Sequence, residues 1–309
     1  MKQLRTDLAM EAAGIHGSED LPGVSISGWE SSGVQITEVH IQTEEGSRLI
    51  GKPEGHYITL ECDGVRRRDA DARTAMGTLL GEELARLLPD DSDEPVLVVG
   101  LGNRMVTPDA LGPMTVDGTL VTRHLYRELP HLTDHRMSPV CAIAPGVLGI
   151  TGIETMEMVR SIVQSVRPRA VIAVDSLAAR SISRVGSAVQ LTDTGIQPGS
   201  GVGNHRSALT EESLGVPVIA LGVPMVIYAA TIARDAFELL AGEDDSAEQE
   251  EALDQMAEEL LAGSMGEMIV TPREVDALVE DAANMLSCGI NRALHPGLSP
   301  SDLLTMMNP

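Results

Sequence analysis

The sequence predicts an α/β protein with a mostly parallel, doubly wound sheet flanked by helices, and three observations lead to this fold class. Short, continuous apolar runs alternate along the middle of the chain with longer segments of helical period. The runs lack the apolar–polar alternation of a strand with one wet face, so both of their faces should be covered. With 309 residues, 43% of them hydrophobic, the chain is long enough for one large core of this kind.

The first part of the chain has a different character and predicts an N-terminal, β-rich addition. Residues 1–33 are polar and rich in glycine, and they show no firm period. Within about residues 34–62, two stretches alternate between apolar and polar positions as strands do, at 34–42 and 56–62. Two glycines between these stretches indicate a bend that joins the two strands.

The α/β core is expected over about residues 70–240, and helices close the chain over about 246–294. The core begins with a helix over 70–88, where alanine, methionine and leucine recur near helical spacing. It continues with four apolar strands at 95–101, 139–144, 170–174 and 216–223, and with helices at 109–128, at 152–166 and after the fourth strand. The closing helices are expected at 246–263 and 273–294.

Composition and charge argue against several classes of function. Aromatic residues make up only 2% of the chain, which predicts an aliphatic core and argues against a surface that stacks nucleic-acid bases. The 22 basic and 46 acidic residues give a formal net charge of −24, which repels phosphate backbones and anionic lipids. We therefore expect no direct nucleic-acid binding. No apolar run reaches the roughly 18 residues of a membrane span, so no membrane association is expected either.

The cysteines and the start of the chain fit a cytoplasmic protein. Cys62, Cys141 and Cys288 are odd in number and far apart, and no C-x-x-C motif suggests zinc or redox chemistry. Residues 1–14 contain no apolar signal core. A reducing compartment therefore fits the sequence best.

Two aspartates are the leading candidates for chemistry, because ligands of open α/β sheets bind outside the carboxyl ends of the strands. Asp109 and Asp175 each follow an apolar strand and could face one crevice. Two carboxylates that lie close together cannot easily both ionise, so the pair can share a proton. One carboxylate could then deprotonate a water while the other donates to a carbonyl oxygen, as in metal-free aspartic-protease chemistry.

Each aspartate also has a structural interpretation, and the residues alone leave both interpretations open. Thr107 could cap a helix whose first turn holds Asp109, where the helix dipole favours a negative charge. Asp175 could instead be the ion-pair partner of Arg180 or Arg184, which follow it closely.

A third polar segment, residues 193–204, contains Asp193 and a glycine-rich loop. The closely spaced glycines of this loop are Gly199, Gly201 and Gly203. They match neither the G-x-G-x-x-G pattern nor the P-loop pattern of nucleotide sites, so they predict a loop that could cover a substrate backbone. Asp109, Asp175 and Asp193 could together hold a divalent ion, but their spacing does not show it.

A series of short motifs runs almost from one end of the chain to the other. The motifs lie at residues 5–9, 98–103, 106–113, 121–124, 142–146, 151–155, 175–181, 193–196, 198–204 and 270–276. In this order they resemble the germination protease family, and together they are highly specific. Two departures are that Ser176 stands where the family commonly has alanine, and that the region between Leu240 and Gly263 is reduced.

The resemblance implies an atypical aspartic endopeptidase that works without a metal or other cofactor. The two essential aspartates of the family match Asp109, in the segment T-P-D-A-L-G-P, and Asp175, which opens D-S-L-A-A-R-S. Members are similar in fold to hydrogenase-maturation proteases and assemble as homotetramers. They degrade small acid-soluble spore proteins during germination, in the cytoplasm of the forespore and spore core.

The resemblance also implies a zymogen that shortens itself near its N-terminus. The family cuts after an acidic residue and a bulky apolar residue, and before an alanine that is followed two residues later by another acidic residue. Residues 6–11 fit this pattern, with the bond between Leu8 and Ala9 as the expected cut. Residues 1–8 would then be a pro-segment, and 9–309 a single catalytic domain.

Two other functions remain open at the level of the sequence. A metal-assisted peptidase of the hydrogenase-maturation type would use the same carboxylates as ligands. A non-enzymatic module would bind a nucleotide or another small ligand at the glycine loop, residues 199–204.

Overall fold

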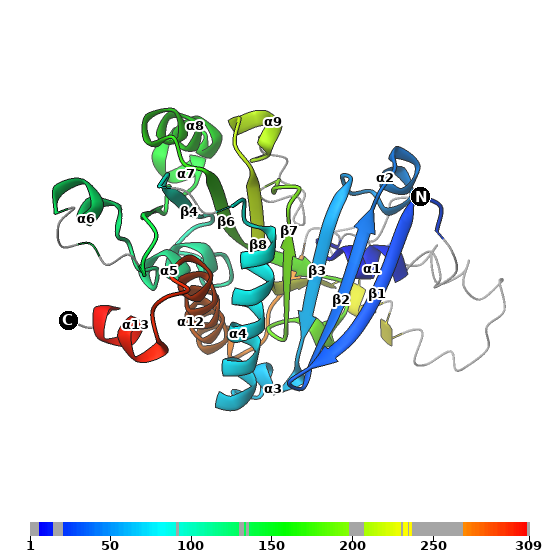
Figure 1. Cartoon of the computed structure of the whole chain (residues 1–309). Coiled ribbons are helices and arrows are strands. Elements are labelled where there is room, and N and C mark those ends of the chain that lie inside the picture. Colours follow the sequence, from blue (N-terminus) through cyan, green and yellow to red (C-terminus); the bar gives the residue numbers. More distant parts are fainter. Residues whose placement is uncertain are drawn as a thin grey trace.

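The structure is a computed structural model that describes residues 6–14, 21–90, 93–129, 133, 136–197, 207–229, 231–233, 235, 236 and 268–307. Within these residues the chain forms an α/β fold in which a nine-stranded sheet carries helices on both faces (Figure 1). The helix predicted at 246–263 and the glycines Gly199, Gly201 and Gly203 lie outside the described residues.

The strands and helices have the following bounds. The strands are β1 (Val24–Ser31), β2 (Val34–Ile41), β3 (Gly55–Glu61), β4 (Val96–Gly100), β5 (Val140–Ile143), β6 (Ala170–Ala179), β7 (Ala188–Thr192), β8 (Val218–Tyr228) and β9 (Ile269–Val270). The α-helices are α1 (Ala9–Gly14), α2 (Glu44–Ile50), α3 (Asp63–Arg66), α4 (Ala70–Leu87), α5 (Leu111–Asp117), α6 (Arg123–Glu128), α7 (Leu148–Thr151), α8 (Thr155–Val166), α9 (Glu211–Leu214), α12 (Val275–Leu294) and α13 (Pro300–Met307). Two 3₁₀ turns are η1 (Thr107–Asp109) and η3 (Ile182–Arg184).

The sheet is mixed, which confirms the α/β class but makes the prediction of a mostly parallel sheet wrong. Strands β5, β4, β6 and β8 lie side by side in that order and run parallel. Strands β7, β3, β2 and β1 then extend the sheet, each antiparallel to its neighbour, and β9 pairs antiparallel with the same β8. The N-terminal strands thus continue the core sheet through β7, which the sequence analysis did not predict.

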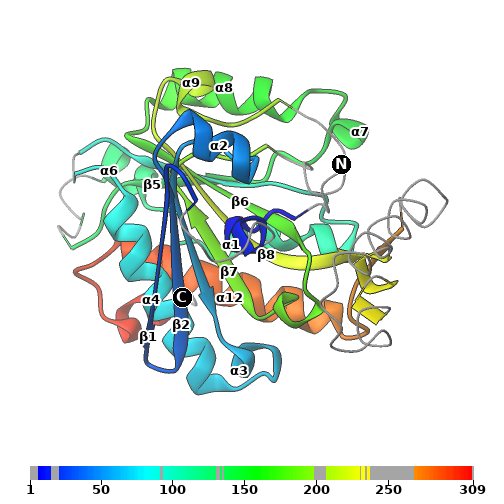
Figure 2. The same ribbon diagram turned by 90° about the vertical axis from the view of Figure 1, so that its right-hand side faces the viewer.

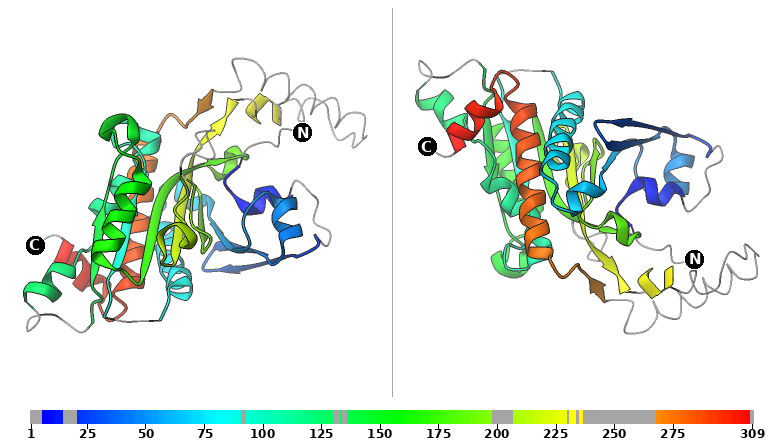
Figure 3. Two further views of the ribbon diagram at one scale, coloured as in Figure 1. Left: turned by 90° about the horizontal axis from the view of Figure 1, so that it is seen from above. Right: turned by 90° about the horizontal axis from the view of Figure 1, so that it is seen from below.

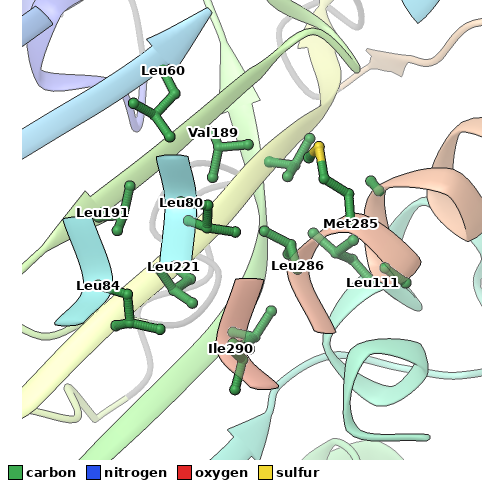
Figure 4. Close-up of a cluster of buried hydrophobic side chains, with 14 of the residues drawn as sticks. Leu60, Leu80, Leu84, Leu111, Val189, Leu191, Leu221, Met285, Leu286 and Ile290 are labelled. Atoms are coloured by element: carbon green, nitrogen blue, oxygen red, sulfur yellow. The ribbon is translucent and has the colours of Figure 1, made fainter. Parts of the chain in front are cut away.

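The larger core lies on the face of the sheet that α4, α5 and α12 cover. Figure 4 shows Leu80 and Leu84 of α4 and Leu286 and Ile290 of α12 gathered around Leu221 of β8. These side chains are almost completely buried, so they account for much of the apolar area removed from water on folding. The aliphatic core that the low aromatic content predicts is confirmed.

Two smaller clusters cover other parts of the sheet. On the opposite face, Val159 and Val163 of α8 pack on Leu97 and Val99 of β4. Near the N-terminus, α1 and α2 lie together against β2 and β3, as the two views in Figure 3 show. These contacts hold α1 beside the sheet.

Several predicted elements differ from the structure for local reasons. The helix predicted at 109–128 is two helices, α5 and α6, because α5 ends at Gly118. The following turn is fixed by the side chain of Asn291, which accepts from the Leu120 N–H at 2.8 Å and donates to the Gly118 carbonyl at 2.9 Å. The bend expected between the first two predicted strands is the helix α2. Thr43 caps this helix, and Gly51, at φ 75°, ends it.

The third predicted strand is also longer than expected. It was predicted at 170–174, whereas β6 continues to Ala179. Asp175 therefore lies within a strand and not after one. None of the described helices combines the length and the apolar character that a membrane span requires.

Candidate active site

Asp175 lies on β6 at the point where the pairing of β6 with its neighbour β4 ends. Strand β4 pairs with β6 up to the pair Gly100–Val174, and its chain then leaves the sheet. Asp175 is the next residue of β6, and it remains paired on the other side with Gly222 of β8. It is 6% exposed, and its Oδ1 accepts from the N–H of Ser176 at 2.9 Å. A nearly buried carboxylate therefore sits at the carboxyl end of the β4–β6 pairing.

Asp109 lies in the turn η1, just beyond the end of β4. Its carboxylate Oδ2 accepts from the backbone N–H of Asn103 at 2.8 Å, which ties the turn to the loop after the strand. Gly102 has φ 108°, and a methyl group there would collide with the carbonyl oxygen of Asp109. A glycine is therefore needed at this position to let Asp109 fold back over the loop.

Close backbone contacts bring the two aspartates to the same end of adjacent strands. The N–H of Leu101 donates to the carbonyl of Val174 at 2.8 Å, directly before Asp175. The start of α5 presses on the same place, since a methyl group on Gly112 would collide with Leu101 and lie 2.5 Å from the Val174 oxygen. The turn η1 packs against β6 and β8. The elements that carry Asp109 and Asp175 therefore lie next to each other, and the pairing of the two carboxylates stays a prediction.

Two contacts bear on the alternative structural roles of these aspartates, which stay open. The residue before η1 is Val106, with no side-chain cap, so Thr107 does not cap this turn as proposed. Arg184 does not need Asp175 as a partner, because its guanidinium pairs with Glu11 at 3.1 Å and with Glu61 at 2.6 Å.

Asp193 is not brought to the same place. Strand β7 runs antiparallel to β8, so the residues after it emerge toward the amino ends of the parallel strands. Asp193 Oδ1 accepts from the N–H of His56 at 2.8 Å, at the start of β3. This contact ties Asp193 to the start of β3, so the structure does not bring Asp193 together with Asp175.

Gln190 is a residue of this region that the sequence analysis missed. Gln190 pairs in register with Gly222, and Gly222 pairs with Asp175, so the three residues form a row across β7, β8 and β6 on one face of the sheet. Gly222 carries no side chain, and the side chain of Leu177 occupies the space above it. Gln190 belongs to an unpredicted strand and no motif includes it, so the sequence offers no signal for it.

The predicted cleavage site lies on the same face, bound to Gln190. The Gln190 side chain donates to the carbonyl of Asp7 at 2.9 Å and accepts from the N–H of Ala9 at 2.7 Å. Leu8 and Ala9 are both 0% exposed. Figure 2 shows α1, which begins at Ala9, beside β7 and β8. The Leu8–Ala9 bond is therefore held over the face of the sheet that carries Asp175.

Glu11 anchors α1 to the end of β6. Its carboxylate accepts from the N–H groups of Arg180 at 2.7 Å and Ser181 at 2.9 Å, and from the hydroxyl of Thr6. Together with Arg184, these donors surround a carboxylate that is 5% exposed. A buried charge is tolerated where it is paired and hydrogen-bonded in this way.

Two further features of the described residues concern chemistry. The hydroxyl of Ser176, beside Asp175, is buried and has no hydrogen-bond partner among them. Among the same residues, no three His, Cys, Asp or Glu side chains are arranged to hold a metal ion.

Comparison with known proteins gives a consistent match over nearly the whole chain. A family model described as Germination protease matches residues 4–246 and 245–305. A protein named Germination protease from Caldanaerobacter subterraneus subsp. tengcongensis is 43% identical over 318 residues, which cover 99% of this chain and 98% of that protein. The protein of that name from Clostridium tetani is 39% identical, with 99% of each chain covered. The one from Bacillus subtilis is also 39% identical, with 96% of this chain and 94% of that protein covered.

Proposed function

Because this chain belongs to the germination protease family and is an endopeptidase of that family's aspartic type, we propose that it starts the degradation of small acid-soluble spore proteins during germination. The observation that supports this proposal is the full-length match to proteins named Germination protease. The protein would then act as a homotetramer in the cytoplasm of the forespore and spore core. A likeness to hydrogenase-maturation proteases is expected in the parallel strands β5, β4, β6 and β8.

Asp109 and Asp175 are the residues that we assign to catalysis. Asp175 lies within β6 where its pairing with β4 ends, and it is almost buried, while Asp109 lies in the turn η1 that packs against β6. Burial and a neighbouring carboxylate both favour a shared proton over two full charges. The ionised member would take a proton from the attacking water, and the protonated member would donate to the carbonyl oxygen of the peptide. When the C–N bond breaks, the proton taken from water passes to the leaving nitrogen and a hydroxyl proton of the tetrahedral intermediate returns to the other carboxylate, so the pair again holds one proton.

The substrate assignment is tested by digesting a purified small acid-soluble spore protein after exhaustive chelation of metals. We expect cuts after a bulky apolar residue that follows an acidic one, identified by mass spectrometry of the products. An unfolded protein without this pattern is the control and should stay intact. Loss of activity on chelation would contradict the metal-free mechanism and favour a metal-assisted peptidase instead.

Self-cleavage between Leu8 and Ala9 would convert the full chain to the form that starts at Ala9. The pattern of residues 6–11 supports this site, and so does the position of the bond on the sheet face that carries Asp175. Mass spectrometry of the incubated protein should show the loss of residues 1–8, and Leu8→Gly should block it. A shortened form that starts elsewhere would contradict the site.

A further inference from the structure

Residues 6–8 bind to the body of the protein as a peptide ligand would. Asp7 pairs with β6 through two bonds, from its N–H to the carbonyl of Ala178 at 2.9 Å and from the Ala178 N–H to its Oδ2 at 2.8 Å. Gln190 holds the next peptide groups through the carbonyl of Asp7 and the N–H of Ala9. The bonds made by the Asp7 N–H, the Asp7 carbonyl and the Ala9 N–H involve only the backbone of the segment, so they depend little on its sequence, which is typical of peptide recognition at a strand.

The side chain of Leu8 fills an apolar site between β6, β8 and the loop before β7. Its buried neighbours are Leu177 and Ala179 of β6, Val185 of the loop and Ile227 of β8. We call these four residues the Leu8 site. The leucine is 0% exposed, so a glycine or a charged residue in its place would lose the apolar contacts or bury a charge. The Leu8 site is therefore selective for a bulky apolar residue.

The position before Leu8 is selective for an acidic residue. The Asp7 carboxylate accepts from the Ala178 N–H, and it also interacts with the charge of Lys52. Burial lowers the pKa of Lys52, and the nearby carboxylates of Asp7 and Glu11 act in the opposite direction. If residues 1–8 left, Lys52 would lose one of the two carboxylates that favour its charge.

We propose that the Leu8 site, Gln190 and Ala178 form the binding site for the part of a protein substrate that precedes the cleaved bond. This assignment rests on the proposed function, and in particular on the removal of residues 1–8. The ligand is an extended peptide with an acidic residue followed by a bulky apolar residue. Gln190 is a positioning residue, because it holds the peptide groups on both sides of the apolar residue. Residues 6–8 occupy this site in the full chain.

The position of Asp175 is the physical reason to identify this site with the substrate site. If one pair of carboxylates cuts both the chain itself and other proteins, both peptides must present their bond at one place. Gln190 and Asp175 share one face of the sheet, about 10 Å apart across two strand spacings, and the side chain of Leu177 lies above Gly222 between them. A peptide held by Gln190 therefore lies on the face of Asp175, and its bond must shift toward Asp175 to be cut.

The test uses a labelled peptide of residues 1–8 and the full chain, with binding measured by fluorescence anisotropy. In the wild-type chain its own segment competes at high effective concentration, so the added peptide should bind weakly. In the full-length variant Leu8→Asp, residues 6–8 should leave the site, because the change would bury a charge. The affinity of this variant for the added peptide should then be at least roughly tenfold higher than that of the wild type. Adding Gln190→Ala or Ala179→Leu to this variant should weaken binding about tenfold, and so should Leu8→Gly in the peptide.

The outcomes separate this assignment from the proposed function. Equal affinity of the peptide for all these variants, with folding verified by circular dichroism, would overturn the binding site. Unchanged KM for a small acid-soluble spore protein at saturating peptide would overturn its role in substrate binding, because the two ligands should compete. If the peptide binds the variants in the expected order but the enzyme cleaves no protein, the binding site is supported and the proposed function is contradicted.

Discussion

At the scale of single residues, the two candidate aspartates could be found from the sequence, but their surroundings could not. Asp109 and Asp175 follow apolar runs and match motifs of the family, and the structure brings their elements together. What holds them in place is a set of close contacts across Gly102 and Gly112. Such contacts either join residues that are distant in the chain or fix unusual backbone angles. Neither effect produces a periodic pattern of residues in the sequence. Gln190 was missed for the same reason.

Gly102→Ala should therefore lower the cleavage activity much more than a glycine-to-alanine change at a position with open space around it. The new methyl group meets the carbonyl of Asp109, and a φ of 108° is strained for alanine, at a cost of about 1–3 kcal/mol in stability. A displacement of Asp109 by about 1 Å should reduce kcat/KM by roughly 100-fold. Gly149→Ala is the matched control, because a methyl group there meets nothing within 4 Å. Equal activity of the two variants in the cleavage assay would show that the Gly102 turn does not position Asp109.

His295 should make stability depend on pH. Its ring is buried and hydrogen-bonded as the neutral form, accepting from the Ser138 N–H at 3.3 Å, and burial lowers the pKa of this histidine from its usual 6.5. As pH falls through 6.5, the unfolded chain binds a proton that the folded chain does not. The free energy of unfolding should therefore decrease, down to the pKa of the folded state. Urea unfolding between pH 7.5 and roughly 5 should show this loss, and His295→Gln should reduce it. The exposed His124→Gln is the control and should leave it unchanged.

At the scale of elements, the long apolar or periodic segments could be predicted, and the short ones could not. Strands β4, β5, β6 and β8 and helices α4, α8 and α12 were all expected near their observed places. Strand β1 was missed because its side chains are mostly exposed, so they need no alternation of apolar and polar residues. The six-residue α1 is too short for a periodic signal, and its position is fixed by the tertiary contacts of Glu11.

Glu11→Ala should release α1 from the sheet. The change removes the acceptor for two backbone N–H groups and one partner of Arg184, which should cost roughly 3 kcal/mol in local stability. Hydrogen exchange of residues 9–14 should become at least about 10-fold faster, while exchange in α4 stays unchanged. The exposed Glu44→Ala is the control. Unchanged protection of α1 in Glu11→Ala would contradict the anchoring role.

At the scale of the whole molecule, the division into a β-rich addition and an α/β core does not describe the sheet. The antiparallel strands β1, β2 and β3 continue the parallel strands through β7, so one sheet runs through both parts. Leu60 of β3 and Leu84 of α4 belong to the same buried cluster. The sequence could not show this join, because it depends on which distant strands pair.

The chain should therefore unfold in one cooperative step. Leu60→Ala in β3 and Leu84→Ala in α4 should each lower the same single thermal transition, at a cost of about 2–5 kcal/mol. Differential scanning calorimetry measures the number of transitions and their midpoints. Two transitions, with each variant shifting only one of them, would show that the N-terminal strands form a separate unit.

The proposed mechanism depends most on the pairing of Asp109 with Asp175, and the rate of peptide-bond cleavage by asparagine variants tests this pairing most directly. Each of Asp109→Asn and Asp175→Asn should lower kcat on a small acid-soluble spore protein by at least about 100-fold, since neither half of the pair can transfer the proton alone. Asp117→Asn changes an exposed aspartate that pairs with Arg104, and it should cleave as the wild type does. If either Asp109→Asn or Asp175→Asn remains folded and cleaves at the wild-type rate, the proposed catalytic pair is contradicted.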